Sequence, residues 1–337
     1  MKIDTLLLTH DLKQMPALTR AAEAIGFDGL WTAETQSDPF LPLALAAEHS
    51  QRMNLGTSIA VTFPRSPGTL AYLAWDLARM SDGRFILGLG AQVRAHNERR
   101  FGAVWAKPIR KMRETIEAIR AFWDNWQNGT PLNYEGEFFK LNLMTPFFSS
   151  GPLTTPPPPI YIAALNEKML RLAGSHCDGV HLHALHTVKY MREFALPHIE
   201  EGFRKSGKTR ADFSVSTGLF AIPSDSPNAA RQEAYVRQQI SFYMSTPAYR
   251  VVADLHGWNE LAFRLSKMAR RGEWEAMPGQ IPDEVLAEMA VTGSWADLPG
   301  IIRQKYGDLL DRVSYYMPFV PGEEDAGWQA TVAGFKK

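Results

Sequence analysis

Side chains that can move protons or hydrogen-bond a ligand recur directly after predicted strands of this chain. Carboxylates and imidazoles serve as general acids and bases, whereas hydroxyl and amide groups orient a ligand. In a parallel barrel, the C-terminal ends of the strands meet at one face, where the chemistry gathers. We therefore expect one site that brings together Glu34, Thr35, Thr57, Ser58, Ile59, Gln92, His96, Ala164, Leu165, Asn166 and His183.

A pair of histidines could bind a metal ion, contact a cofactor or substrate, or only form hydrogen bonds in the core. His181 and His183 lie two residues apart on a predicted strand and point the same way, with His186 just beyond. A zinc or iron site would need a third and a fourth ligand, and no H-E-x-x-H or comparable pairing supplies them. We expect no metal. His183, which is nearer the C-terminal end of the strand, is the better candidate for contact with a cofactor or substrate.

Other motifs resemble active-site signatures without their context. Residues 202–209 match the phosphate-loop pattern G-x-x-x-x-G-K-[ST], but they close a predicted helix instead of following a strand. Gly88 and Gly90 lack the third glycine of a dinucleotide site. No G-x-S-x-G elbow is present, and Cys177 has no activating pattern around it. The sequence thus supports neither a Rossmann domain nor covalent acyl chemistry.

The segment 65–90 shows which elements position these residues. Ser66 and Pro67 predict the start of a helix, apolar residues at three- and four-residue spacing predict its buried face, and Asp82 with Gly83 predicts the turn that ends it. Residues 85–89 are almost entirely apolar, which is typical of a parallel strand covered on both faces. This is one βα unit of a barrel.

Strands and helices alternate in this way along the whole chain. The longest predicted helix covers about 109–127 and has one apolar face. The pattern predicts a single (β/α)8 TIM-barrel domain over 1–337, with insertions after the fourth and seventh strands at about 92–108, 129–158 and 244–290. The predicted strands are 3–8, 28–33, 55–61, 84–90, 159–164, 178–183, 212–221 and 312–319.

The amino-acid composition indicates which kinds of molecule this protein binds. The chain has 337 residues, 45% of them hydrophobic and 21% charged, and its formal net charge is zero. Without a run of like charges, we expect no nucleic-acid or membrane partner and a small-molecule substrate. One cysteine excludes a disulfide framework, and the N-terminal apolar run is too short for a signal peptide. We expect a cytoplasmic protein.

The segment R-S-P, an apolar helix and then S-D-G-R-F-I-L-G-L-G resembles the signature of the bacterial luciferase-like superfamily of flavin and deazaflavin enzymes. The likeness extends over nearly the whole chain, through GFDGLWTAET (26–35), LGTSIAV (55–61), PIYIAALNEKMLRLAGSHCDGV (159–180) and VTGSWADLPGIIRQKYGDLLDRV (291–313). Within the superfamily the chain looks closest to the F420-dependent oxidoreductases, judging by AETQSDPFLPLALAAEH, GLGAQVRAHNERRFG and FYMSTPAYRVVADLHGW.

The resemblance implies roles for the strand ends. In related enzymes an acidic residue followed by histidine faces the cofactor ring, and here Glu34 and Thr35 stand at those positions. Because that histidine is missing, Glu34 itself or His96 would handle a proton, or the enzyme would perform hydride transfer alone. A salt bridge that only holds the structure is the alternative for Glu34.

The resemblance has two further implications, and both concern how the cofactor is bound. Relatives have a non-proline cis peptide where Ser58 and Ile59 stand, next to Thr57, and its bulge supports the central ring. Their cofactor phosphate lies against backbone amides at the positions of Ala164, Leu165 and Asn166, where a helix N-terminus suits an anion. Relatives often have glycine in place of Asn166. Glu167 would repel a phosphate unless it turns outward.

Three functions remain open from the sequence. The first is a flavin-type oxidoreductase, with coenzyme F420 ahead of FMN; an FMN enzyme would be a monooxygenase that uses oxygen and a separate flavin reductase. The second is a metal-dependent hydrolase on the same fold, motivated by His181 and His183. The third is a barrel without catalytic activity, motivated by Thr35 and Asn166. Relatives are commonly dimers, so we expect a homodimer.

Overall fold

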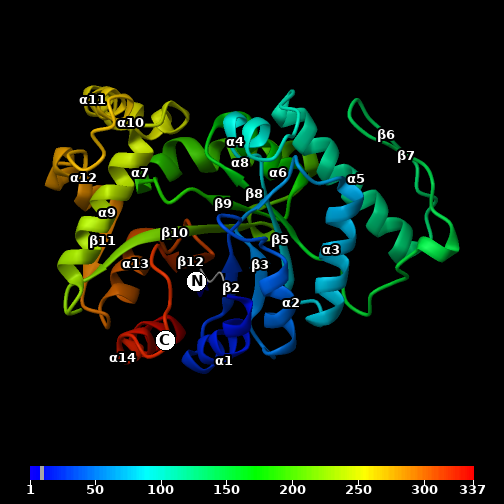
Figure 1. Cartoon of the computed structure of the whole chain (residues 1–337), viewed down its shortest axis with the longest axis horizontal. Helices are drawn as coiled ribbons and strands as arrows, with labels where there is room; N and C mark the ends of the chain where they lie inside the picture. Colours follow the sequence, from blue (N-terminus) through cyan, green and yellow to red (C-terminus); the bar gives the residue numbers. More distant parts are fainter. Residues whose placement is uncertain (8–10) are drawn as a thin grey trace.

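The computed structural model describes residues 1–7 and 11–337, and the expected strand residue Leu8 lies outside them. The strands follow one another around a closed parallel barrel in the order β1, β2, β3, β5, β8, β9, β10 and β12, and β12 pairs back with β1 (Figure 1). Helices surround the barrel, and both chain ends lie at the same end of it, beside α1 and α14. The predicted TIM barrel is therefore confirmed.

The predicted strands correspond to the barrel strands, with ends that differ by a few residues. The strands are β1 (Lys2–Leu6), β2 (Gly29–Thr32), β3 (Asn54–Thr57), β4 (Ala60–Val61), β5 (Phe85–Gly90), β6 (Tyr134–Glu135), β7 (Lys140–Leu141), β8 (Ile160–Ala164), β9 (Gly179–Leu182), β10 (Ser214–Pro223), β11 (Ala290–Gly293) and β12 (Arg312–Tyr315). The helices are α1 (Met15–Ile25), α2 (Leu41–Glu48), α3 (Pro67–Met80), α4 (Arg94–Arg99), α5 (Pro108–Asn128), α6 (Glu167–His176), α7 (Val188–Tyr190), α8 (Leu196–Ser206), α9 (Ala229–Met244), α10 (Arg250–His256), α11 (Asn259–Arg270), α12 (Asp283–Met289), α13 (Leu298–Tyr306) and α14 (Asp325–Lys336).

The βα unit at 65–90 forms as its sequence predicts. The hydroxyl of Ser66 accepts a hydrogen bond from the Thr69 amide, which caps α3, and Pro67 is its first residue. Asp82 and Gly83 have positive φ angles in the turn that follows. All six residues of β5 are buried. Local signals were sufficient here because the cap, the turn and the strand each depend on adjacent residues.

Two strands differ from the expectation. The expected strand 55–61 is two pieces, because the Ser58–Ile59 peptide bond between β3 and β4 is cis, as the resemblance implied. The short strand β11 was not expected; it pairs with the last four residues of β10, beyond the part of β10 that completes the barrel. With only two of its four residues buried, β11 lacks the apolar run that made the other strands recognisable.

The barrel interior contains an ion pair that the sequence did not reveal. The Asp4 carboxylate accepts hydrogen bonds from Arg312 at 2.7 and 2.8 Å and from the Trp31 indole at 2.9 Å. Their side chains are almost fully enclosed, at 0% exposure for Asp4 and 4% for Arg312. Burial lowers the pKa of Arg312, but the adjacent Asp4 outweighs it and raises that pKa above its usual value. The pair joins the first barrel strand to the last.

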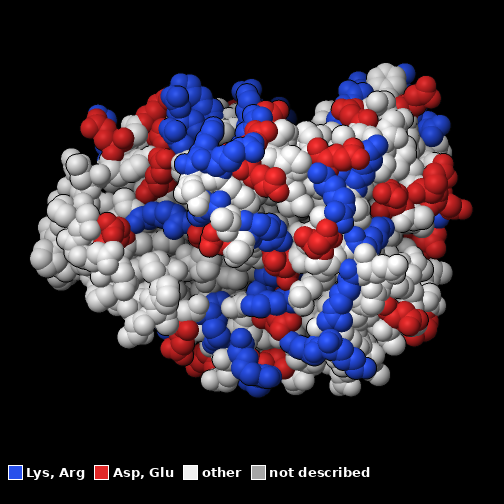
Figure 2. Space-filling view, turned by 180° about the vertical axis from the view of Figure 1, so that it is seen from behind, with Lys and Arg blue, Asp and Glu red and all other residues white. Residues whose placement is uncertain are grey.

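The predicted insertions lie outside the barrel. One contains α4, and the segment between α5 and β8 forms an arm with the hairpin β6–β7 (Figure 1). Residues 141–166 contain no charged side chain, and Leu143, Phe147 and Phe148 on this arm are exposed. Seen from behind, the corresponding end of the molecule carries few charges (Figure 2). The helices α9 to α12 follow β10 and lie together beside the barrel (Figure 1).

Two motifs set aside above have structural roles. Gly207, within the phosphate-loop look-alike, ends α8 with a φ of 72°, and the Lys208 amine donates hydrogen bonds to the Cys177 carbonyl and to Asp178. Burial raises the pKa of the Cys177 thiol, which favours the unreactive protonated form. Within the described ranges, no helix has both the length and the apolar character needed to span a membrane.

Candidate active site at the barrel mouth

Glu34 anchors one side of the barrel mouth through an ion pair. Its carboxylate accepts hydrogen bonds from both terminal nitrogens of Arg65, at 2.7 and 3.1 Å, and from the Val61 amide at 2.6 Å. Arg65 also contacts Asp38 and the Val61 carbonyl. Burial lowers the pKa of Arg65, but these carboxylates outweigh it and raise that pKa. The structure thus contains the salt bridge given above as the alternative for Glu34, and proton transfer by this residue stays a prediction.

The cis peptide lies against β5, where two glycines leave room for it. The Thr57 hydroxyl donates to the Gly88 carbonyl at 2.6 Å and accepts from the Gly88 amide at 3.0 Å. A Cβ atom at Gly88 would lie 1.8 Å from the Thr57 carbonyl oxygen, and one at Gly90 would lie 2.5 Å from the Ile59 side chain. The L-G-L-G pattern therefore follows from close approach of β3 and β4. The Glu34 amide also donates to the Ile59 carbonyl, which ties the ion pair to the bulge.

Three of the predicted residues lie at the exposed rim. The Thr35 carbonyl accepts a hydrogen bond from Arg100, just after α4, so α4 lies close to the end of β2. Gln92 has a φ of 55° and bonds the neighbouring Val93 amide. His96 is exposed on α4. Between the described residues, no hydrogen bond or ion pair joins Gln92 or His96 to Glu34, and their convergence on one ligand stays a prediction.

The start of α6 lies at the other side of the mouth, directly after β8. Ala164 and Leu165 are buried, and Asn166 precedes the helix without capping it. Instead, the Asn166 side chain donates to the Ala248 carbonyl at 3.1 Å. Glu167 pairs with Arg171 one turn later, so its carboxylate is directed along the helix. The first amides of α6 therefore lack a side-chain acceptor, the condition in which a helix N-terminus attracts an anion.

His183 lies near this helix start among aromatic rings. Its ring centroid is 4.4 Å from that of Tyr243 and 4.4 Å from that of Tyr249. The Leu185 amide donates to Nδ1 at 3.0 Å, so the proton of the neutral ring is on Nε2. Burial, aided by the charge His186 would carry, lowers the pKa of His183 to about 3. At neutral pH His183 is thus a hydrogen-bond donor without charge.

The remaining two histidines are enclosed. His181 packs against Trp31 and Tyr161 inside the barrel, while the Nδ1 atom of His186 lies 2.9 Å from the His183 carbonyl. Burial lowers their pKa values to about 3 and about 4. Across the part of the chain that the structure describes, no three histidine, cysteine or acidic side chains are grouped to bind a metal ion. The hydrolase alternative therefore has no ligand set here.

Sequence reasoning missed the two partners that define the mouth. Arg65 is 31 residues from Glu34, and only its place in the family-like segment marked it. Tyr316, directly after β12, hydrogen-bonds Tyr243 hydroxyl to hydroxyl. The expected strand 312–319 included Tyr316, so the rule that site residues follow strand ends did not mark it.

Known proteins are similar to this chain in sequence and in architecture. The family model described as luciferase-like monooxygenase matches residues 2–311. An uncharacterized protein of Mycobacterium tuberculosis is 45% identical over 303 residues, which is 88% of this chain and 89% of that protein. A putative coenzyme F420-dependent oxidoreductase of the same organism is 30% identical over 292 residues, 81% of this chain and 82% of its own length.

A solved structure supports the fold. The coenzyme F420 dependent tetrahydromethanopterin reductase from Methanopyrus kandleri superposes with a TM-score of 0.78 over 99% of this chain and 97% of its own, at 21% identity. The parallel barrel agrees with this solved structure, and the family model covers most of the sequence. The chain belongs to the luciferase-like monooxygenase family.

Proposed function

We propose that this protein transfers hydride between the deazaflavin coenzyme F420 and a small organic substrate, such as an alcohol, an enone or an imine. The observation that carries the proposal is the N-terminus of α6, which opens at the barrel mouth without a side-chain cap. The relative at 30% identity that is described as F420-dependent supports the choice of cofactor. Family membership supports oxidoreductase chemistry more generally.

The residues at the mouth fit a phosphorylated cofactor with a planar ring. The amides at the start of α6 would hold the phosphate, because the Asn166 and Glu167 side chains are engaged elsewhere. Ser58 and Ile59, both only partly buried, would support the ring at the bulge. When bound, the deazaflavin supplies a ring carbon that gives or accepts a hydride.

The protein's own groups would orient the substrate and exclude water. The Nε2–H of His183 can donate to a carbonyl or hydroxyl oxygen, and its neutral ring adds no charge beside the reacting carbon. Tyr243 and Tyr249 flank this donor with apolar surface. The Glu34 carboxylate accepts all three of its hydrogen bonds from N–H groups of Val61 and Arg65. Its best-supported role is therefore to position Arg65 and the bulge. His96 stays the other predicted candidate for proton transfer.

An FMN-dependent monooxygenase is the second candidate, because the matching family is described by that activity. FMN also carries a phosphate, so the start of α6 would serve it equally well. The test is a fluorescence titration of the purified full chain with F420 and, separately, with FMN. Binding of F420 at micromolar or lower concentration, at least tenfold tighter than FMN, is expected. Preference for FMN would overturn the choice of cofactor, and binding of neither would favour a barrel without this activity.

Two variants test the phosphate position directly. Asn166→Asp places a negative charge at the first turn of α6, so it should weaken F420 binding about tenfold. Glu167→Gln is the matched control, since its carboxylate pairs with Arg171 and its removal adds no negative charge. Equal Kd values for the wild type and Asn166→Asp would show that the phosphate lies elsewhere.

A further inference from the structure

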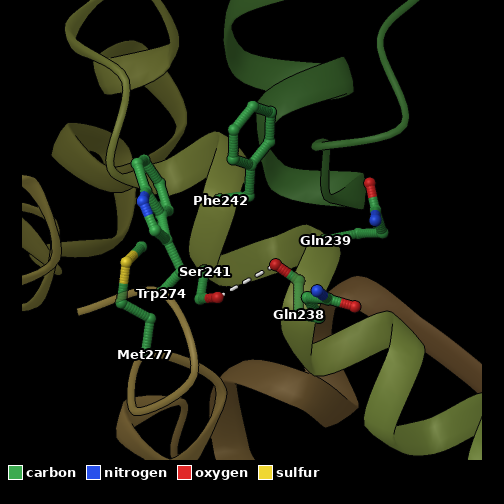
Figure 3. A pocket seen from close by; sticks show the side chains of 6 residues that line it. All are labelled: Gln238, Gln239, Ser241, Phe242, Trp274 and Met277. Carbon is green, nitrogen blue, oxygen red and sulfur yellow. Dashed lines mark hydrogen bonds between the residues drawn. The ribbon is translucent and has the colours of Figure 1, made fainter. Parts of the chain in front are cut away.

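A pocket of about 210 Å³ lies outside the barrel, against the exposed face of α9 (Figure 3). Its lining combines two aromatic rings, one thioether, one hydroxyl and two amides. Trp274 and Met277 enter from the loop after α11, opposite the α9 residues. The lining residues are Gln238, Gln239, Ser241, Phe242, Trp274 and Met277.

The walls of the pocket are two aromatic side chains that stay half exposed. Phe242 is 46% exposed and Trp274 is 48% exposed, although their ring centroids are only 6.1 Å apart. Ser241 and Met277 form a buried floor, and the Ser241 hydroxyl is already bonded to the Gln238 carbonyl. Apolar walls with a few amide groups are the usual composition of a small-molecule site.

None of the six described residues that line this pocket carries a charge. Of the charged residues close to them in sequence, Arg237 is paired with Glu233 and Asp283, and Arg271 with Glu273, whereas Glu275 is exposed. An ionic ligand group would therefore find no charged partner in the lining itself. The two glutamine amides can donate or accept one or two hydrogen bonds from a neutral ligand. The lining thus favours an uncharged, planar and apolar ligand.

The pocket adjoins the barrel mouth along α9. Gln239 precedes Phe242 and Tyr243 by three and four residues, so these residues are neighbours on the surface of α9. The ring of Phe242 lies 5.3 Å from that of Tyr243, which lies 4.4 Å from that of His183. The rings of His183, Tyr243 and Phe242 thus form one row between the barrel mouth and the pocket.

We propose that the pocket between Phe242 and Trp274 binds an uncharged, planar apolar group. Resting on the function proposed above, this group is the far end of the substrate, whose reacting end lies beside His183. The pocket would then select substrates by the size and charge of the part that does not react. Such contacts change affinity for the substrate without touching the cofactor.

The test measures binding of 2-acetonaphthone, an uncharged naphthyl ketone, to the full chain by isothermal titration calorimetry. Saturable binding at one site is expected. Phe242→Ala and Trp274→Ala should each weaken it about tenfold, because each removes one aromatic wall. Phe263→Ala is the matched control, since Phe263 on α11 is also 48% exposed but does not line the pocket. The anion 2-naphthoate should bind at least tenfold more weakly than the ketone.

Other outcomes overturn the proposal. Absence of saturable binding by the wild type would do so, as would binding that neither wall variant changes or that Phe263→Ala weakens equally. Gln239→Trp fills the pocket without removing a wall, so it should block binding even if an alanine variant fails to fold. F420 titration of Phe242→Ala separates the two proposals: an unchanged Kd for F420 with lost ketone binding supports the pocket, whereas failure of F420 to bind the wild type contradicts only the cofactor assignment.

Discussion

The barrel interior and the barrel mouth each contain one arginine–carboxylate pair and one histidine of the 181–183 segment, but in different settings. Inside, Asp4 and Arg312 are enclosed, and Trp31 supplies a further donor. At the mouth, Arg65 keeps 16% of its side chain exposed and contacts the backbone beside the cis peptide. The same pair of chemical groups thus closes the barrel in one place and shapes a binding surface in the other. Burial, more than residue type, separates these roles.

The largest effect should come from breaking the interior pair. Arg312→Met leaves the Asp4 carboxylate buried without its partner, which costs about 3–5 kcal/mol of unfolding free energy. Urea denaturation at pH 7 measures the loss. Replacing both residues by apolar ones, as in Asp4→Leu with Arg312→Met, should recover part of it. A loss below about 1 kcal/mol for the single variant would mean that the interior pair contributes no more to the free energy of unfolding than a surface ion pair does.

Breaking the mouth pair should cost less stability. Glu34→Gln removes the charge that Arg65 contacts, and we expect a loss of about 1–3 kcal/mol, since Asp38 remains. Cofactor affinity should stay within about threefold. If Glu34 only positions Arg65, turnover survives, whereas a sharp fall in turnover with F420 affinity intact would assign it a proton. Asp38→Asn, on a more exposed partner, should cost at most about 1 kcal/mol.

Acid should act on both regions through their histidines. The pKa of His181 and of His183 is about 3 in the folded state, below the ordinary value of 6.5, so the unfolded chain binds more protons between these values. Stability should therefore fall as pH decreases from about 6.5 towards 3, by up to about 1.4 kcal/mol per pH unit for each histidine.

His183→Asn keeps an acceptor for the Leu185 amide and removes one of the two histidines. In urea denaturation at pH 7, 6, 5 and 4, the free energy of unfolding of this variant should therefore depend less steeply on pH than that of the wild type. Equal slopes for the wild type and His183→Asn would mean that the His183 ring is hydrated in the folded protein.

The smallest effect concerns the hydroxyl pair at the mouth. Tyr316→Phe removes the hydrogen bond to Tyr243, and we expect a loss of about 0.5–1 kcal/mol in thermal or urea unfolding. Tyr235→Phe is the control, because the Tyr235 ring stacks on Tyr316 and does not share that bond. Equal losses for both variants would mean that the bonded hydroxyl pair stabilises the protein no more than the Tyr235 hydroxyl does.

The fold was predictable because its signals are local. The cap at Ser66, the apolar run of β5 and the stripe of α5 each lie within a few residues, and all three form as expected. By contrast, Asp4 and Arg312 are separated by 308 residues, and a charged pair in sequence gives no sign that it is buried. The short, half-exposed strand β11 was not predicted because its four residues contain no continuous apolar run.

The sequence marked positions of the candidate site but not their contacts. Glu34, Ser58, Ile59 and Asn166 closely follow barrel strands, yet what Glu34 and Asn166 touch depends on segments far away in the sequence. Asn166 bonds Ala248, which lies 82 residues later in an insertion, and no local pattern links the two positions. Partners of this kind follow only from the packed structure, so the roles of these residues remain predictions.

The Asp4–Arg312 pair also bears on how the chain is synthesised. Because translation begins at the N-terminus, Asp4 leaves the ribosome long before the residue that neutralises its charge inside the barrel. Until Arg312 emerges, β1 has β2 as its only neighbour, and the seam between β1 and β12 stays open. The barrel can therefore close only after residue 312 has been synthesised, and nascent chains that stop before that residue should remain sensitive to proteases at this seam.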